Sequence, residues 1–201
     1  MNIDLISPIP IGVFQNSNFD EHCELINLKY NQTQDGGQSD DTYVLNSYAK
    51  NLKLWIESCI SEYTRNCLAS YQKLKITQSW CVRHNNQISR LHQHKHPNSF
   101  ISGAYYVECS ESSNGITFFS NSIISDNQFE WEKDNNLLMN QHWLWREYPY
   151  QVQKGKLIIF PSNLMHYVKE SHVLDNRCVL SFNTWFVGDV GTHNLLTELK
   201  Q

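Results

Sequence analysis

The chain has 201 residues and a mass of 23.6 kDa, with 40% hydrophobic and 18% charged residues. This composition can bury a core and excludes a disordered or collagen-like chain. Lys and Arg number 16 against 20 Asp and Glu, and the net charge of −4 gives no electrostatic basis for nucleic acid or an anionic membrane as a main partner.

The N-terminal residues MNIDLISPIPIGVFQ lack the basic region and the small-residue cleavage site of a signal peptide. No apolar run reaches the roughly 18 residues of a membrane span. We therefore expect an intracellular, cytoplasmic protein. At this length one domain over residues 1–201 is expected, with an arm and helices over 1–72 and a β-rich core over 73–190.

The first predicted element is an extended arm over residues 5–14, whose prolines bar it from the centre of a sheet and favour an edge. Asn18 is then expected to cap a short helix that runs to Leu28, with Glu21 in the capping-box position. Residues 31–41 are polar and contain glycines, which predicts a mobile loop.

Residues 41–71 have a helical pattern without Pro or Gly. Apolar side chains recur at steps of three and four residues, which predicts one long helix, or two with a break near Asn51, packed on a sheet. The stripe consists of Val44, Tyr48, Leu52, Trp55, Ile56, Ile60 and Tyr63. We expect it to pack in the core and to supply no catalytic group.

After Tyr71 the apolar period changes to two, which is typical of strands. The predicted strands cover residues 76–82, 100–107, 116–119, 151–152, 156–160 and 178–187. No helical pattern separates them, so an antiparallel sandwich or barrel is expected. The predicted fold class is mainly β with N-terminal helices, in a jelly-roll arrangement of two sheets.

Residues 120–148 form a long, aromatic-rich and poorly periodic segment. A connection of this length in a compact domain usually serves a function or is partly disordered. Its main part, residues 126–148, contains Trp131, Trp143, Trp145 and Arg146. We expect this part either to close over a substrate or to form an oligomer contact, for instance in a homodimer.

Three histidines at alternate positions, His92, His94 and His96, lie just before the strand over 100–107. In an extended segment alternate side chains point to one face, so two of these imidazoles can chelate one metal ion. Imidazole suits Fe, Zn, Cu and Ni. This motif alone is also compatible with a chance cluster of exposed histidines, but a second group of residues supports a metal site.

The second group begins where an apolar strand runs into Pro161 and a turn leads to His166. Arg177 then opens a strand whose alternation aims Arg177, Ser181 and Asn183 to one side. A buried arginine is costly unless an anion meets it, and its planar fork suits a carboxylate. The pattern predicts a metal with open coordination positions beside a cation, which fits Fe(II) with a 2-oxo acid.

These residues resemble the 2-oxoglutarate- and iron(II)-dependent oxygenase superfamily, and more narrowly its small bacterial and phage members with an HxHPxS…SGxYY segment. This chain has HKHPNS at 94–99, SGAYY at 102–106, FPS at 160–162 and SFN at 181–183, with His166 and Arg177 between the last two. The similarity covers residues 76–187. It implies a double-stranded β-helix with helices packed on one sheet, and a reaction that uses Fe(II), 2-oxoglutarate and O2.

The resemblance implies that His94 and His166 are iron ligands and that Arg177 holds the far carboxylate of 2-oxoglutarate. Most of the superfamily has His-x-Asp or His-x-Glu, whereas this sequence has His96 in place of the acid. His96 is then a third ligand or lies outside the coordination sphere, and a pair of His92 and His94 is a further alternative. We favour His94, His96 and His166 because HxHP leads into the strand at the family's spacing. With one negative charge fewer, the site is expected to bind Fe(II) less tightly or to accept another metal.

Further residues are candidates for the 2-oxoglutarate site. Either Tyr105 or Tyr106 donates its hydroxyl to the 2-oxoglutarate carboxylate, because alternation lets only one of them face inward. Ser181 and Asn183 are expected to line the site beside Arg177. Trp80 is expected in the core, and the histidines at positions 22, 84, 142, 172 and 193 at the surface or in caps.

The favoured function is a 2-oxoglutarate-dependent dioxygenase of the EC 1.14.11 type, acting on an unknown substrate for which a prolyl or other peptide side chain is the first candidate. One alternative is a cupin-like metalloenzyme with three histidines that does not use 2-oxoglutarate. The other is a metal-free binding protein on the same barrel. The position of Arg177 distinguishes the dioxygenase from the cupin-like metalloenzyme. If Arg177 faces solvent or pairs with an internal acid, the argument that the protein binds 2-oxoglutarate fails.

Overall fold

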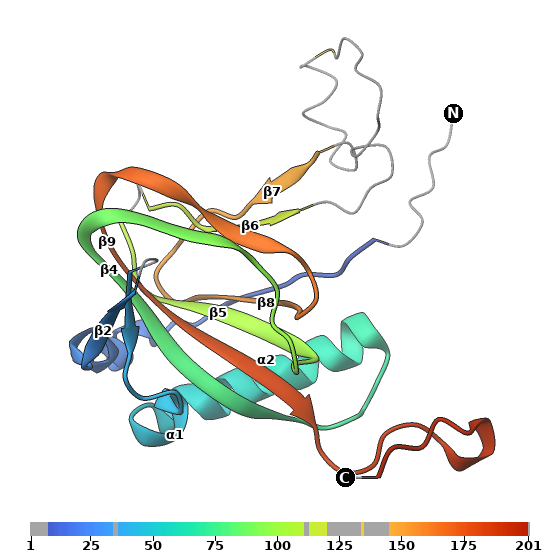
Figure 1. Cartoon of the computed structure of the whole chain (residues 1–201). Coiled ribbons are helices and arrows are strands. Elements are labelled where there is room, and N and C mark those ends of the chain that lie inside the picture. Colours follow the sequence, from blue (N-terminus) through green and yellow to red (C-terminus); the bar gives the residue numbers. More distant parts are fainter. Residues whose placement is uncertain (1–7, 34–35, 111–112, 120–133, 135–144, 201) are drawn as a thin grey trace.

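The computed structural model describes residues 8–33, 36–110, 113–119, 134 and 145–200 (Figure 1). Its helices are a 3₁₀ helix Phe19–Asn27, α1 (Val44–Ser47), α2 (Lys50–Leu68) and a short 3₁₀ helix His193–Leu195. Its strands are β1 (Gly12–Gln15), β2 (Tyr30–Thr33), β3 (Gly36–Ser39), β4 (Leu74–His94), β5 (Ile101–Glu108), β6 (Ile116–Phe119), β7 (Glu147–Pro149), β8 (Lys156–Pro161) and β9 (His166–Phe186).

Two long strands connect the layers of the fold. β4 and β9 have 21 residues each and pair antiparallel from Leu74 opposite Phe186 to His94 opposite His166. The larger layer has the strand order β1-β8-β5-β9-β4-β3-β2, and β6 and β7 extend the smaller layer from the first residues of β9. Register shifts along the far part of β4 permit the bend from one layer into the other, seen in Figure 1. The fold is a double-stranded β-helix, as the sequence predicts.

Two hydrophobic clusters hold the fold together. The first lies where α2 packs on the outer face of the larger layer (Figure 1). It contains Leu52, Ile56, Leu180 and Phe182. The second contains Phe118, Ile158 and Phe160, from strands of both layers. The helices thus cover one sheet from outside, which leaves the space between the layers for a site. Within the described residues, no helix combines the length and the apolar character that crossing a membrane requires.

The helical stripe is confirmed with one exception. Two helices form, with the break at residues 48–49, and Val44, Leu52, Ile56, Ile60 and Tyr63 are buried. Tyr48 is 51% exposed, because it lies in the break and not in the regular part of α2. Asn18 precedes the first 3₁₀ helix without a side-chain capping bond, so the predicted cap is wrong.

The predicted loop over residues 31–41 and the predicted strand over residues 151–152 are also wrong. Residues 31–41 were predicted as a loop, yet β2 and β3 form there as a hairpin on the open edge of the larger layer. An edge strand accepts polar side chains because one of its sides faces water. Residues 151–152 are not a strand, and β7 lies at Glu147–Pro149 instead. Much of the predicted flap over residues 126–148 lies outside the described residues.

Gly103 on β5 lies directly opposite Phe182 on β9. A Cβ at position 103 would lie 2.3 Å from the Phe182 ring, which is fully buried in the core beneath α2. We therefore expect Gly103→Ala to lower the free energy of unfolding by about 1–3 kcal/mol, as overpacking does elsewhere. Urea denaturation measures this effect. An unchanged midpoint and slope would show that the ring has room to move.

Candidate metal centre and its cavity

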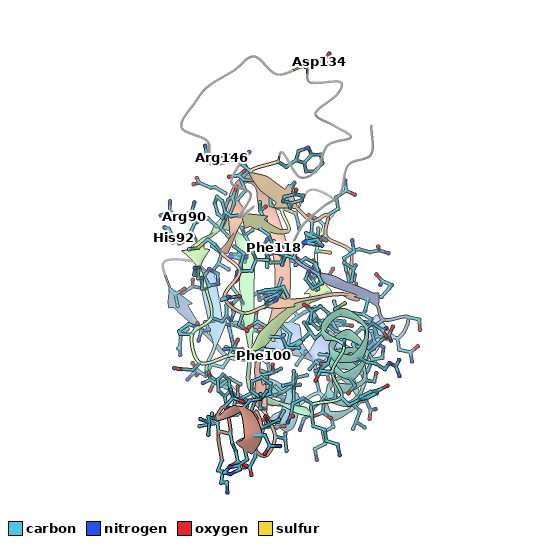
Figure 2. The ribbon with its side chains drawn as sticks, turned by 90° about the vertical axis from the view of Figure 1, so that its right-hand side faces the viewer. Arg90, His92, Phe100, Phe118, Asp134 and Arg146 are labelled. Atoms are coloured by element: carbon cyan, nitrogen blue, oxygen red, sulfur yellow. The ribbon has the colours of Figure 1, made fainter. Side chains whose placement is uncertain are left out.

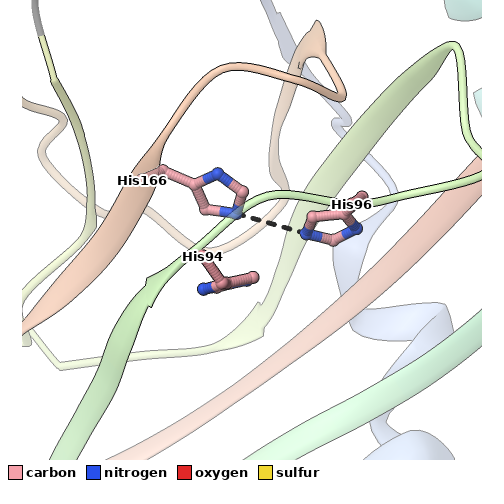
Figure 3. Close-up of side chains that lie close together, drawn as sticks. All are labelled: His94, His96 and His166. Carbon is pink, nitrogen blue, oxygen red and sulfur yellow. Dashed lines mark hydrogen bonds between the residues drawn. The ribbon is translucent and has the colours of Figure 1, made fainter.

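Three imidazoles converge where β4 ends and β9 begins (Figure 3). The antiparallel register places His94 opposite His166, and His96 follows two residues after the end of β4. One ring nitrogen from each histidine lies within 4.8 Å of the others. The Nε2 atoms of His96 and His166 are 3.2 Å apart. Residues distant in sequence are therefore brought within reach of one metal ion.

The hydrogen bonds at Nδ1 leave each Nε2 with its lone pair. Nδ1 of His94 lies 2.7 Å from the His92 carbonyl oxygen, and Nδ1 of His166 lies 2.8 Å from the Leu164 carbonyl oxygen. Nδ1 of His96 lies 2.7 Å from Oδ1 of Asn183. Because these oxygens only accept, each Nδ1 carries the proton. Histidine ligands of metals usually donate their second nitrogen in this way, so all three rings are in the ligand tautomer.

Burial keeps two of the rings uncharged. Desolvation lowers the pKa of His166 to about 3, a shift that its bond to the Leu164 carbonyl opposes and that the nearby imidazoles reinforce. Desolvation also lowers the pKa of His96, which its bond to Asn183 partly opposes. The two rings therefore offer neutral nitrogens to a metal near pH 7, without losing protons first.

The cluster opens into a cavity of about 480 Å³ between the layers. The three histidines, Tyr106, Arg177 and Ser181 all line it. Arg177 is 2% exposed, so it does not face solvent. The cavity therefore contains both three clustered imidazoles and a buried cation.

Two hydrogen-bond acceptors of the buried cation lie among the described residues. The guanidinium of Arg177 donates to Nδ1 of His84 at 2.9 Å and to the carbonyl oxygen of Asn114. A guanidinium has five N–H donors, so these two bonds do not exhaust its capacity for a carboxylate. Burial raises the pKa of the neighbouring Tyr106, against the opposing charge of Arg177. The Tyr106 hydroxyl accepts a bond from the Ile116 amide at 3.0 Å and keeps its own proton for donation.

The structure shows which of the candidate side chains lie at the cavity and which do not. Tyr106 lines the cavity, whereas Tyr105 packs on the helix side and meets Trp55 edge-on. Ser181 lines the cavity, and Asn183 contacts His96 instead of Arg177. His92 is exposed, as Figure 2 shows beside Arg90 at the outer rim, and does not belong to the imidazole cluster.

Three predicted placements are wrong. His84 and His22 are 2% and 4% exposed and are not surface residues. Trp80 is only partly buried, lines the cavity and stacks on His96 with ring centroids 5.9 Å apart. Strand alternation on β4, which puts Trp80 and His84 on one face, was the signal that could have found both. His193 is exposed as expected, while His142 and the side chain of His172 lie outside the described residues.

The donor set fits a transition metal. Among the described residues the three histidines are the group that meets the spacing for a metal ion, and they include no carboxylate. Neutral imidazoles suit Fe(II) as well as Zn, Cu and Ni. Three ligands leave positions for further donors on an ion that takes more than three. The side chains present are thus compatible with an iron site of unusual charge.

Comparisons with known proteins agree with this geometry. Residues 78–183, more than half of the chain, match the protein family described as "Putative 2OG-Fe(II) oxygenase". No curated protein matches significantly in sequence. HygX from Streptomyces hygroscopicus, with nickel and 2-oxoglutarate bound, is similar in structure with a TM-score of 0.60 at 11% identity, over 88% of this chain and 82% of HygX.

Two further solved structures have the same fold. An oxidoreductase of the 2OG-Fe(II) oxygenase family from Burkholderia pseudomallei matches with a TM-score of 0.57 at 11% identity, over 86% of this chain and 84% of its own. EctD from S. alaskensis with bound Fe matches with a TM-score of 0.60 at 11% identity, over 88% of this chain and 72% of its own. At these identities the likeness establishes the double-stranded β-helix.

Proposed function

The chain belongs to the 2OG-Fe(II) oxygenase family, and on this premise we propose that His94, His96 and His166 hold Fe(II) while Arg177 holds 2-oxoglutarate. Fe(II) and 2-oxoglutarate are the cofactor and co-substrate of this family, and O2 is the second co-substrate. The enzyme is accordingly a dioxygenase of the EC 1.14.11 type.

One observation carries the assignment of residues. Three imidazoles, each with its Nδ1 proton directed to an acceptor, bring one ring nitrogen each within 4.8 Å of the others, in a cavity that also contains a buried arginine. A chance cluster of histidines has no reason to share one tautomer. A solvent-facing arginine would support the cupin-like alternative, whereas Arg177 is buried in the same cavity.

Each residue has a separate task in the proposed site. The guanidinium of Arg177 binds the far carboxylate of 2-oxoglutarate, and the Tyr106 hydroxyl donates a further hydrogen bond to it. Ser181 lines the same wall, while Asn183 orients His96 through its Nδ1 proton. When bound, iron and 2-oxoglutarate supply the oxidation: 2-oxoglutarate becomes succinate and CO2, and the two atoms of O2 enter succinate and the C–H bond of the substrate. The protein supplies orientation and the cavity between the layers in which the reactants meet.

For the substrate we propose a prolyl or other peptide side chain. The cavity wall from β3, the connection to α1 and the start of β4 contains Gln38, Thr42 and Gln78, whose amides and hydroxyl can bond to peptide groups. The indole of Trp80, next to His96, offers an apolar surface for a ring or an alkyl side chain. Among the described residues of the lining there is no Asp, Glu or Lys, which favours an uncharged side chain.

The reaction is tested by incubating the Fe(II)-loaded protein with labelled 2-oxoglutarate in air. We expect labelled succinate, formed slowly without a primary substrate and faster with a reactive peptide. Peptides with neutral side chains, proline among them, are then screened for the mass gain of one oxygen atom. Chelator-treated protein and an anaerobic sample are the controls. Absence of succinate above these controls, from protein with verified iron content, would contradict the proposed reaction.

A further inference from the structure

We propose that His84 is a positioning residue for 2-oxoglutarate: it fixes the direction of the Arg177 guanidinium without neutralising its charge. This inference rests on the proposed role of Arg177 as the carboxylate-binding residue. His84 lies outside the motifs that the sequence shares with the oxygenases, and it is not one of the candidate metal ligands.

The contact is part of the sheet. His84 on β4 lies opposite Arg177 on β9 in the antiparallel register, and each side chain is 2% exposed. Both line the cavity, and Nδ1 of His84 lies 2.9 Å from a terminal nitrogen of Arg177. An arginine nitrogen can only donate, so Nδ1 of His84 must accept. The proton of His84 is therefore on Nε2, and the ring is uncharged in this contact.

The ring is enclosed on its other side by the β2–β3 hairpin. A Cβ at Gly36 would lie 2.8 Å from Nε2 of His84 and 2.7 Å from its Cδ2. Gly36 also has φ +117°, which strains any other residue. The backbone of β3 thus packs against the imidazole, which restricts its rotation. The polar, glycine-containing segment that the sequence suggested as a loop therefore has a structural task beside the cavity.

An uncharged acceptor suits a cation that must bind an anion. A carboxylate at position 84 would pair with the guanidinium and compete with the carboxylate of 2-oxoglutarate. A position without an acceptor would remove one of the bonds that fix the direction of the guanidinium. The imidazole gives direction without adding a negative charge beside the guanidinium, and neither replacement does both.

Three variants separate direction from charge. The amide oxygen of His84→Asn can replace Nδ1, His84→Ala removes the acceptor, and His84→Asp has the shape of Asn with a negative charge. The Kd of 2-oxoglutarate is measured by calorimetry on Mn(II)-loaded protein, so that no turnover is needed. We expect a Kd within about threefold of wild type for Asn, a rise of roughly 10-fold for Ala, and a larger rise for Asp.

Binding of Mn(II) provides the internal control, because none of the three changes touches a proposed ligand. His193→Asp introduces the same charge at an exposed position and should leave both affinities unchanged. Equal 2-oxoglutarate affinity in all variants, or equal losses in Asn and Ala, would overturn the positioning role. If His84→Asp does not fold, the comparison of Asn with Ala decides the matter. Failure of the wild type to bind 2-oxoglutarate would instead overturn the proposed function, and this inference with it.

Discussion

Arg177→Ala is expected to raise the Kd of 2-oxoglutarate by roughly 30-fold or more, because truncating one member of a buried, hydrogen-bonded charge pair typically costs about 2–5 kcal/mol. The affinity for Mn(II) is expected to stay within about threefold of wild type, since the imidazoles are unaffected. Calorimetry with Mn(II) and then with 2-oxoglutarate measures both quantities on one sample. A weaker affinity for 2-oxoglutarate with an unchanged affinity for Mn(II) would show that Arg177 serves a carboxylate site separate from the metal ligands.

The size of the effect follows from burial. Arg177 is 2% exposed, and a charge pair that is buried is screened less by solvent and salt than a pair at the surface. Arg90, which is half exposed and pairs with Glu170 across 3.8 Å, provides the matched control. Arg90→Ala should leave 2-oxoglutarate binding unchanged. Similar losses in both variants would indicate a general effect of charge, and no loss at Arg177 would leave the cupin-like alternative as the better explanation.

Strand alternation predicted the inner face of β9 correctly. Arg177 and Ser181 line the cavity as the period of two requires. The same rule could not choose between Tyr105 and Tyr106, because both faces of β5 are buried and either phase satisfies the pattern. Only the position of the helices, which cover the face with Tyr105, makes that choice.

The errors arise where tertiary contacts override local composition. The sequence of the β2–β3 hairpin predicts a loop because its residues are polar and include glycines. The strands form there because β3 pairs with β4, a tertiary contact that local composition does not show. Strand alternation could have placed His84 on the inner face of β4, but not its contact with Arg177, which lies 93 positions away in the sequence. The tautomers of His94 and His166 depend on backbone carbonyls, which no side-chain pattern reports.

His166→Ala is expected to raise the Kd of Mn(II) by roughly 100-fold or more, because loss of an outer partner of a ligand already costs about 10–100-fold. His166 is the most constrained of the three rings, since it is 2% exposed and its Nδ1 proton is held by the Leu164 carbonyl. Electron paramagnetic resonance of Mn(II) titrated into the protein measures the affinity. Succinate formation with Fe(II) should be lost in the same variant.

The same measurement on variants of His92 and His96 tests which histidines bind the metal. His92→Ala is the matched control: its exposed ring is removed, while its backbone carbonyl still accepts the Nδ1 proton of His94. His92→Ala should bind Mn(II) with the affinity of the wild type. If His92 and His94 were the ligand pair, this variant would lose affinity for Mn(II).

His96→Ala should lose as much Mn(II) affinity as His166→Ala, because Nε2 of His96 lies 3.2 Å from Nε2 of His166. A much smaller loss at His96 would place that ring outside the coordination sphere, and wild-type affinity in His166→Ala would remove the metal centre from this end of the cavity.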